Sequence, residues 1–277
     1  MEELRLAYLE LLKKTILDLQ RSGLKEYRPV VYRRKLNLFV KPALAAISKI
    51  EHRKLIVCEE VSFNHEARMN GKDWPLYADS MIGYKRLSNV QQCVTDIIKN
   101  NIEGDMIETG VWRGGTVIFM RGILKAYNIT DRIVWAADSF EGLPKPDVTK
   151  YEADKNDNLY TFNELKVSLD TVKSNFEKYG LLDQQVQFLK GWFKDTLPAA
   201  PIKKLAVIRL DGDMYESTMD SLVNLYPKLS HNGYVIIDDW GSVEGCRLAV
   251  LDYRKKNNIV EEIIPIDSDG VYWKKTQ

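Results

Sequence analysis

The amino-acid sequence predicts an α/β fold in which helices flank a mostly parallel central sheet. From about residue 86 onward, short apolar segments alternate along the chain with segments of helical periodicity. Short buried strands that alternate with helices form right-handed βαβ crossovers, and these make neighbouring strands parallel. The first of these strands runs directly into a glycine-rich turn, as in Rossmann-like sheets that bind nucleosides. We therefore expect a Rossmann-like sheet preceded by a helical N-terminal extension.

The composition is that of an ordinary globular protein. Its 277 residues are 45% hydrophobic and 29% charged, with a formal net charge of +1. A charge so close to zero gives no support to nucleic-acid binding. The three cysteines are far apart and form no metal-binding pair, which fits a reducing cytoplasm. Because no apolar run is long enough to cross a bilayer, stable membrane insertion is not expected.

The N-terminal part, residues 1–85, is predicted to be a helical cap segment that precedes the ligand-binding domain, residues 86–277. Residues 3–20 have the spacing of an amphipathic helix, with a face formed by Leu4, Tyr8, Leu11, Leu12, Thr15 and Leu19. Either the core of the same chain or a second copy must cover this face, and we expect a homo-oligomer, most simply a dimer. Residues 21–54 are locally basic. We interpret them as a solvated face, with an anionic substrate group or a membrane surface as alternatives.

The elements of the second part follow one another in a regular order. Helices are expected at 86–102, 115–128, 163–179, 215–229 and 244–256, and strands at 105–108, 132–137, 186–189, 205–210, 234–237, 263–266 and 271–274. In such sheets ligands bind at the carboxyl ends of the strands, so the residues after each strand are the site candidates. The polar, irregular residues 142–160 follow the second strand, and we interpret them as a lid, with a disordered surface excursion as the alternative.

The first strand ends in an acid followed by a glycine turn. Glu108, Thr109 and Gly110 are followed by Trp112, where a dinucleotide-binding turn has a second glycine that makes room for a pyrophosphate. A bulky side chain at that position suits a cofactor without phosphates. S-adenosylmethionine is such a cofactor, and an acid can hold its ammonium group. A tight turn without any ligand is the alternative.

The second strand ends in Asp138 and Ser139, about 30 residues beyond the glycine turn, as in one βαβ unit. An acid at this position accepts hydrogen bonds from the hydroxyls of a ribose. A solvated aspartate that caps a turn is the alternative. Because the turn and the acid occur together, the nucleoside interpretation is favoured.

Four carboxylates follow two later strands. Asp211 and Asp213 end the strand at 205–210, and Asp238 and Asp239 end the strand at 234–237. If the two strands are neighbours, these charges repel one another by roughly 1 kcal/mol or more per pair, which a bound divalent cation would relieve. Ligation by oxygen alone favours Mg²⁺, Mn²⁺ or Ca²⁺. Some of the acids could instead cap the helices that follow.

At these residues the sequence resembles the macrocin O-methyltransferase family, which methylates sugar hydroxyls in antibiotic biosynthesis. The similar stretches are IETGVWRGG at 107–115, ADSFEGLP at 137–144, LDGDMYEST at 210–218, YVIIDDW at 234–240 and GVYW at 270–273. The resemblance covers about residue 70 to the end. It implies a class I methyltransferase fold and an S-adenosylmethionine-dependent, metal-assisted O-methyltransferase that acts on a sugar or a glycosylated natural product.

The resemblance also implies roles for individual residues. Asp211, Asp238 and Asp239 would hold Mg²⁺ or another hard divalent cation. Asp211 or Asp213 would remove the proton of the sugar hydroxyl. The residues that would line the cofactor are Glu108, Thr109, Gly110, Asp138 and Ser139, with Met81, Gly191 and Trp192 closing over it. Trp192 could instead belong to the core. Two rival functions are a nucleotide-sugar or NAD-dependent enzyme, and a non-catalytic partner-binding protein with the same fold.

Overall fold

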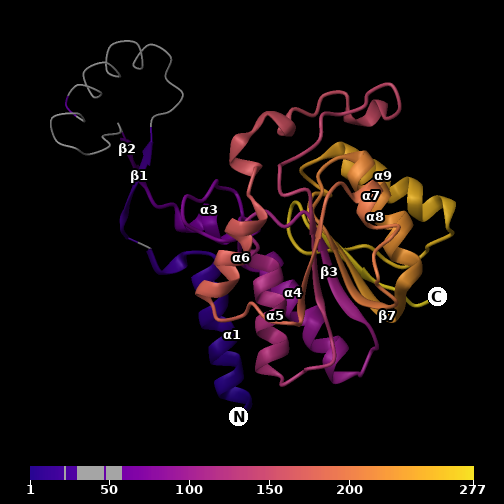
Figure 1. The fold of residues 1–277 in the computed structure, drawn as a ribbon, viewed down its shortest axis with the longest axis horizontal. Coiled ribbons are helices and arrows are strands. Elements are labelled where there is room, and N and C mark those ends of the chain that lie inside the picture. Colours follow the sequence, from indigo (N-terminus) through magenta and orange to yellow (C-terminus); the bar gives the residue numbers. More distant parts are fainter. Residues whose placement is uncertain (22, 30–46, 48–57) are drawn as a thin grey trace.

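The structure, a computed structural model, describes residues 1–21, 23–29, 47 and 58–277. In this part of the chain a seven-stranded sheet has the order β5-β4-β3-β6-β7-β9-β8 (Figure 1). Its strands are β3 (Asp105–Thr109), β4 (Val134–Asp138), β5 (Val186–Lys190), β6 (Leu205–Leu210), β7 (Leu229–Ile237), β8 (Ile264–Pro265) and β9 (Val271–Lys274). The first five pair in parallel, and β9 pairs antiparallel with β7 and β8. The predicted α/β fold with a mostly parallel sheet is confirmed.

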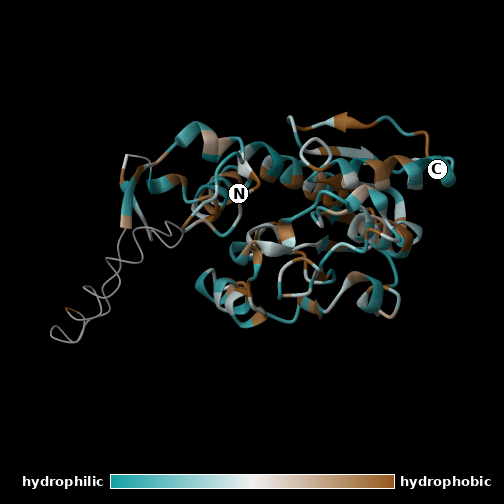
Figure 2. Ribbon diagram, turned by 90° about the horizontal axis from the view of Figure 1, so that it is seen from above, coloured by the Kyte–Doolittle hydropathy of each residue, from teal (hydrophilic) through white to brown (hydrophobic). Residues whose placement is uncertain are grey.

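Helices cover both faces of the sheet (Figure 1). One layer contains α1 (Glu2–Ile16), α4 (Gly83–Lys99), α5 (Gly115–Ala126) and α6 (Leu169–Lys178), and the other contains α7 (Phe193–Thr196), α8 (Tyr215–Leu225) and α9 (Glu244–Lys256). Two clusters of buried apolar side chains fill the spaces between the sheet and these layers. The helices carry hydrophilic and hydrophobic residues along their length, as expected for helices with one buried face (Figure 2).

Several elements differ in extent from those expected. The helix expected at 163–179 begins only at Leu169, because Ser168 accepts a hydrogen bond from the backbone N–H of Thr171 and caps it there. Strand β7 begins at Leu229, five residues earlier than expected. Its first part is polar and irregular in register, so the apolar pattern predicted only the later part of the strand. Short 3₁₀ turns are η1 (Leu19–Arg21), η2 (Glu152–Asp154), η3 (Leu159–Thr161), η4 (Asn163–Leu165) and η5 (Tyr226–Lys228).

The N-terminal segment is not helical throughout. It also contains an antiparallel ribbon of β1 (Lys25–Pro29) and β2 (Cys58–Ser62), followed by α3 (His65–Met69). These strands are short and charged, so they lack the apolar alternation that would predict them. The expected boundary at residue 85 falls within α4, and the division into a cap and a domain stays a prediction. Most of the basic segment 21–54 lies outside the described residues.

Helix α1 packs against α4 and α5 through a face that matches the expected one only in part, since Leu12 and Leu19 of that face are buried. Leu9, Leu12 and Ile16 are buried, whereas Leu4 and Leu11 are 72% and 58% exposed. The position of α5 decides which of two possible apolar stripes faces the core. Within the described part of the chain, no helix combines the length and the apolar character needed to span a membrane.

Candidate active site

The site lies where the chain changes direction across the sheet. From β3 the chain passes through β4 to β5 on one side, and it then returns to β6 and β7 on the other side. The carboxyl ends of β3 and β6 therefore border a crevice, which is where open α/β sheets bind ligands. A cavity of about 710 Å³ opens there. Its walls include the residues that follow β3, β4, β5, β6 and β7, together with parts of the segments 71–81 and 142–165.

Gly110 brings the turn after β3 against the end of β6. Its φ is +88°, a left-handed conformation that favours glycine. A Cβ at this position would lie 2.7 Å from the carbonyl carbon of Asp211 and closer still to the carbonyl oxygen. The turn continues through Trp112, which also has a positive φ and whose Nε1 donates a hydrogen bond to the carbonyl oxygen of Glu164 at 2.9 Å. Trp112 thus connects the glycine turn to the segment after β4.

Asp138 holds this turn from the neighbouring strand. One carboxylate oxygen accepts the backbone N–H of Val111 and the other accepts that of Phe140, each at 2.7 Å. Burial raises the pKa of Asp138, and these backbone hydrogen bonds oppose that rise. Asp138 and Ser139 both line the cavity. Since each carboxylate oxygen has two lone pairs, Asp138 keeps acceptor sites for a ligand.

Glu108 does not reach the cavity. It is the register partner of Arg209 on the adjacent strand, it is 1% exposed, and Arg209 Nη1 donates a hydrogen bond to its carboxylate. Thr109 is also fully buried, and its hydroxyl oxygen accepts a hydrogen bond from Ser221 Oγ at 3.3 Å. The structure therefore does not bring these two side chains to the position expected for contact with a cofactor. The pairing of Glu108 with Arg209 depends on which strands are neighbours in the sheet, so the sequence does not indicate it.

The remaining residues expected around a cofactor line the cavity. Met81, Gly110, Gly191 and Trp192 do so together with Asp138 and Ser139. Trp192 is half-buried at the wall, so the alternative of a plain core residue does not hold. His65 and His231 lie outside the cavity wall, and His52 lies outside the described residues.

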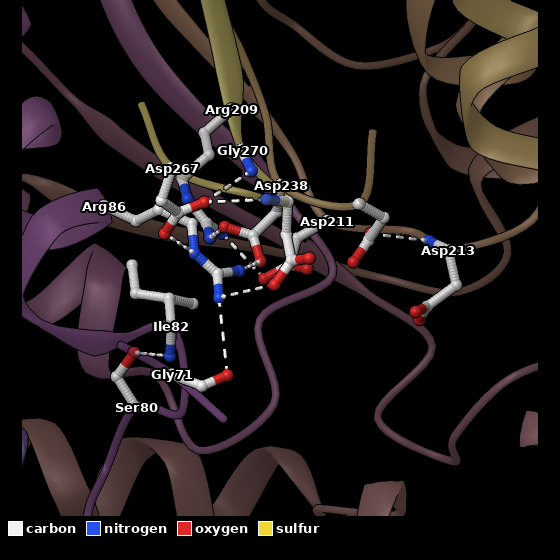
Figure 3. Close-up of polar contacts among 12 residues, drawn as sticks. Gly71, Ser80, Ile82, Arg86, Arg209, Asp211, Asp213, Asp238, Asp267 and Gly270 are labelled. Carbon is white, nitrogen blue, oxygen red and sulfur yellow. Dashed lines mark hydrogen bonds and ion pairs between the residues drawn. The ribbon is translucent and has the colours of Figure 1, made fainter. Parts of the chain in front are cut away.

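Three carboxylates from two neighbouring strands converge at the carboxyl edge of the sheet. Asp211 follows β6, and Asp238 and Asp239 follow β7. One oxygen of each lies within 4.8 Å of the other two. Asp213 stands beside this group in a left-handed conformation with φ 58°, and its backbone N–H donates to Asp239 Oδ2 at 3.2 Å (Figure 3).

Ionisation of the acids in this cluster is unfavourable, because they are buried close to one another. Burial and the neighbouring Asp238 raise the pKa of Asp211 to about 6. The pKa values of Asp213 and Asp239 are raised well above the usual range, first by burial and then by the nearby carboxylates. A group of this kind is stabilised by a cation that neutralises it.

Two arginines supply part of that neutralisation. Arg209 is fully buried, donates to Asp211 Oδ2 at 2.8 Å and also donates to Asp238 Oδ1. Arg86 comes from α4, 152 residues away in the sequence, and donates to Asp238 Oδ2 (Figure 3). The sequence contains no signal for Arg86, because its partner is decided by the packing of α4 against the sheet.

The donor set fits a hard divalent cation. Three carboxylates offer oxygen ligands, which Mg²⁺ prefers, and one oxygen of each lies near enough to the other two for a single ion to contact all three. Five acids in and below the cluster (Glu108, Asp211, Asp213, Asp238 and Asp239) face two arginines, so a bound cation would favour the ionised form of carboxylates whose pKa values are otherwise raised.

The segment expected to be a lid forms one wall of the cavity. Its turn η2 contributes Asp154, whose buried carboxylate accepts the backbone N–H groups of Tyr215 at 2.7 Å and Glu216 at 3.1 Å and so caps helix α8. Farther along, the ring of Phe162 stacks on that of Trp74 with centroids 5.7 Å apart. The segment therefore connects helix α8 to residues 71–81. Its movement stays a prediction.

Comparisons with known proteins show the family to which the chain belongs. The family model described as "Macrocin-O-methyltransferase (TylF)" matches residues 5–275. Demethyldecarbamoylnovobiocin O-methyltransferase of Streptomyces niveus is 53% identical over 227 residues, which cover 82% of this chain and 87% of that protein. Mycinamicin III 3''-O-methyltransferase of Micromonospora griseorubida is 52% identical over 220 residues, 78% of this chain and 86% of that protein. The solved structure of the O-methyltransferase NovP superposes with a TM-score of 0.83 at 45% identity, covering 99% of this chain and 100% of that one.

Proposed function

Because this chain belongs to the macrocin O-methyltransferase family and is therefore an enzyme, we propose that it transfers the methyl group of S-adenosylmethionine to a sugar hydroxyl of a glycosylated natural product. One observation carries the proposal. The nucleoside-type turn at Gly110 and Asp138 and the acidic cluster at Asp211 open into the same cavity. A methyl donor and an acceptor bound there would be in contact.

The cofactor occupies the side of the cavity formed by β3 and β4. Asp138 accepts the ribose hydroxyls with its remaining lone pairs, and the glycine turn lets the backbone approach the nucleoside. Glu108 accepts a hydrogen bond from Arg209 and thereby positions that arginine. We assign it this role in place of a contact with the ammonium group of the cofactor. The position of Trp112 at the cavity wall supports a cofactor that lacks a pyrophosphate.

The acceptor occupies the side formed by β6 and β7. Asp211, Asp238 and Asp239 hold a divalent cation, Mg²⁺ by preference. When bound, this ion lowers the pKa of the acceptor hydroxyl and orients it.

Asp213 is the general base. Asp211 is engaged by Arg209 and belongs to the ligand group, whereas Asp213 lies beside that group with its carboxylate on the cavity wall. Burial and the neighbouring carboxylates raise the pKa of Asp213, which makes its ionised carboxylate a stronger base. It takes the hydroxyl proton while the oxygen forms a bond to the methyl carbon and the bond from that carbon to sulfur breaks. S-adenosylhomocysteine leaves with the sulfur electrons.

A methyl-transfer assay tests the proposal. The enzyme, S-adenosylmethionine and Mg²⁺ are incubated with a panel of deoxysugar glycosides, free sugars and nucleotide sugars, and products are detected by mass spectrometry. We expect methylation of at least one glycoside. Asp213→Asn should reduce kcat by orders of magnitude with little change in cofactor affinity, since it removes the base alone. Asp131→Asn, an exposed acid in the loop before β4, serves as the control. Full activity of Asp213→Asn would contradict the assignment.

We also propose a homo-oligomer, most simply a dimer, in which α1 contributes to the interface. The exposed Leu4 and Leu11 on one helix support this arrangement. Light scattering at micromolar concentration measures it, and a monomeric mass would contradict it. Three free cysteines, Cys58, Cys93 and Cys246, support the cytoplasm as the location.

A further inference from the structure

We infer that Arg86 is a positioning residue that orients Asp238 toward the divalent cation and thereby raises the affinity of the site for that cation. The inference rests on the proposed function. Arg86 lies in the first turn of α4, on the wall of the cavity. Its Nη1 donates to Asp238 Oδ2, and its Nε donates to Asp267 Oδ2 at 3.1 Å, in the turn between β8 and β9.

Asp238 is held on both of its oxygens. Arg209 Nη2 donates to Oδ1, and Arg86 Nη1 donates to Oδ2 (Figure 3). Two planar guanidinium groups on opposite oxygens leave the carboxylate one orientation. Each oxygen has a second lone pair, so Asp238 can ligate a cation while both contacts persist.

The structure leaves little freedom for Arg86 itself. A Cβ on Gly71 would lie 2.6 Å from Arg86 Nη2, and a Cβ on Gly270 would lie 2.8 Å from Arg86 Cδ. Backbone of two separate segments therefore encloses the side chain so closely that a larger residue at either position would push it out. Asp269, from the same turn as Asp267, lies 3.6 Å from Arg86 Nη2. Arg86 thus connects α4, the turn after α3 and the β8–β9 turn to one metal ligand.

Charge alone does not explain an arginine here. Arg209 already places a fully buried positive charge against the same acids. A second positive charge beside the cation site weakens cation binding by repulsion. What Arg86 adds is the orientation of a ligating carboxylate, and outer partners of this kind typically change metal affinity by 10–100-fold. The two contributions have opposite signs, so an experiment can separate them.

Arg86→Lys makes that separation because lysine keeps the positive charge but has no planar fork to hold Asp238 and Asp267 together. Mn²⁺ affinity is measured by electron paramagnetic resonance, and S-adenosylhomocysteine affinity by calorimetry. We expect Mn²⁺ affinity to fall by about 10–100-fold and cofactor affinity to stay unchanged. Arg121→Lys is the matched control, since Arg121 is a buried residue of α5 that pairs with Asp183 at 3.0 and 2.6 Å outside the cavity wall.

A second variant covers the case in which Arg86→Lys does not fold. In Asp267→Asn the amide oxygen can still accept the backbone N–H groups of Asp269 and Gly270, while its NH₂ cannot accept from Arg86 Nε. We expect a loss of Mn²⁺ affinity in the same direction.

Four results would overturn the inference. They are wild-type or tighter Mn²⁺ binding by Arg86→Lys, an equal loss of cofactor affinity in that variant, an equal loss of Mn²⁺ affinity in Arg121→Lys, and wild-type Mn²⁺ binding by Asp267→Asn. If the unmodified enzyme binds no Mn²⁺, the metal part of the proposed function fails and this inference fails with it. Methyl transfer by that metal-free enzyme would still be measurable, so the two failures can be distinguished.

Discussion

Replacing Gly110 with alanine should damage both halves of the site at once. The left-handed φ of +88° costs an alanine about 1–2 kcal/mol. The added Cβ would also stand 2.7 Å from the carbonyl carbon of Asp211, where only backbone can move. Relieving that contact pulls β3 and β6 apart at the hydrogen bond from Asp211 N to the Thr109 carbonyl oxygen, which is 2.9 Å long. Losing this bond costs about 0.5–1.5 kcal/mol. The total is therefore about 1.5–3.5 kcal/mol.

Gly180→Ala is the control that separates conformation from contact. Gly180 follows α6 with a φ of +61°, and a Cβ there would meet nothing within 4 Å. It should show only the left-handed cost, so Gly110→Ala should unfold at a temperature lower than Gly180→Ala by roughly 2–4 °C for each additional kcal/mol. Calorimetry should also detect weaker S-adenosylhomocysteine binding in Gly110→Ala alone. Equal melting temperatures and equal cofactor affinities in the two variants would refute the reasoning.

Four further predictions follow from the site. Chelation of divalent metal should abolish methyl transfer and leave cofactor binding unchanged. Added Mg²⁺ should restore the activity of the wild type but should not fully restore that of Asp211→Asn. Full activity of the chelated enzyme would show that the acids act without metal. Asp138→Ala should weaken S-adenosylhomocysteine binding strongly in calorimetry, because ribose hydrogen bonds to a charged acceptor, each worth about 1.5–3 kcal/mol, are lost; unchanged affinity would contradict that role. Since the pKa of Asp211 is about 6, protons should compete with the cation below that pH, and Mn²⁺ affinity should fall between pH 7 and pH 5; a flat titration would count against Asp211 as a ligand. Residues 145–158 should exchange amide hydrogens faster in the free enzyme than with acceptor bound, and equal strong protection in both states would remove the lid.

The sequence by itself determined the sheet and the edge at which the chemistry lies. The seven segments predicted from residue 105 onward all became strands. Burial on both faces explains the mainly apolar sequences of β3, β4 and β6, whereas β5 and β9 are partly buried and β8 is exposed. Parallel strands direct their carboxyl ends to one edge. Asp138, Asp211, Asp238 and Asp239 could therefore be expected to meet there from their positions alone.

Only the tertiary structure decided what holds these acids. Glu108 looked like a cofactor ligand, yet the register of β3 against β6 turns it toward Arg209 and away from the cavity. Arg86 reaches Asp238 across 152 residues because α4 packs beside β7. The exposed stripe of α1 likewise depends on where α5 lies. The periodicity of the sequence predicts which residues a strand or helix buries. The partner of a buried charge depends on which segments of the chain pack side by side, and no local sequence pattern encodes that packing.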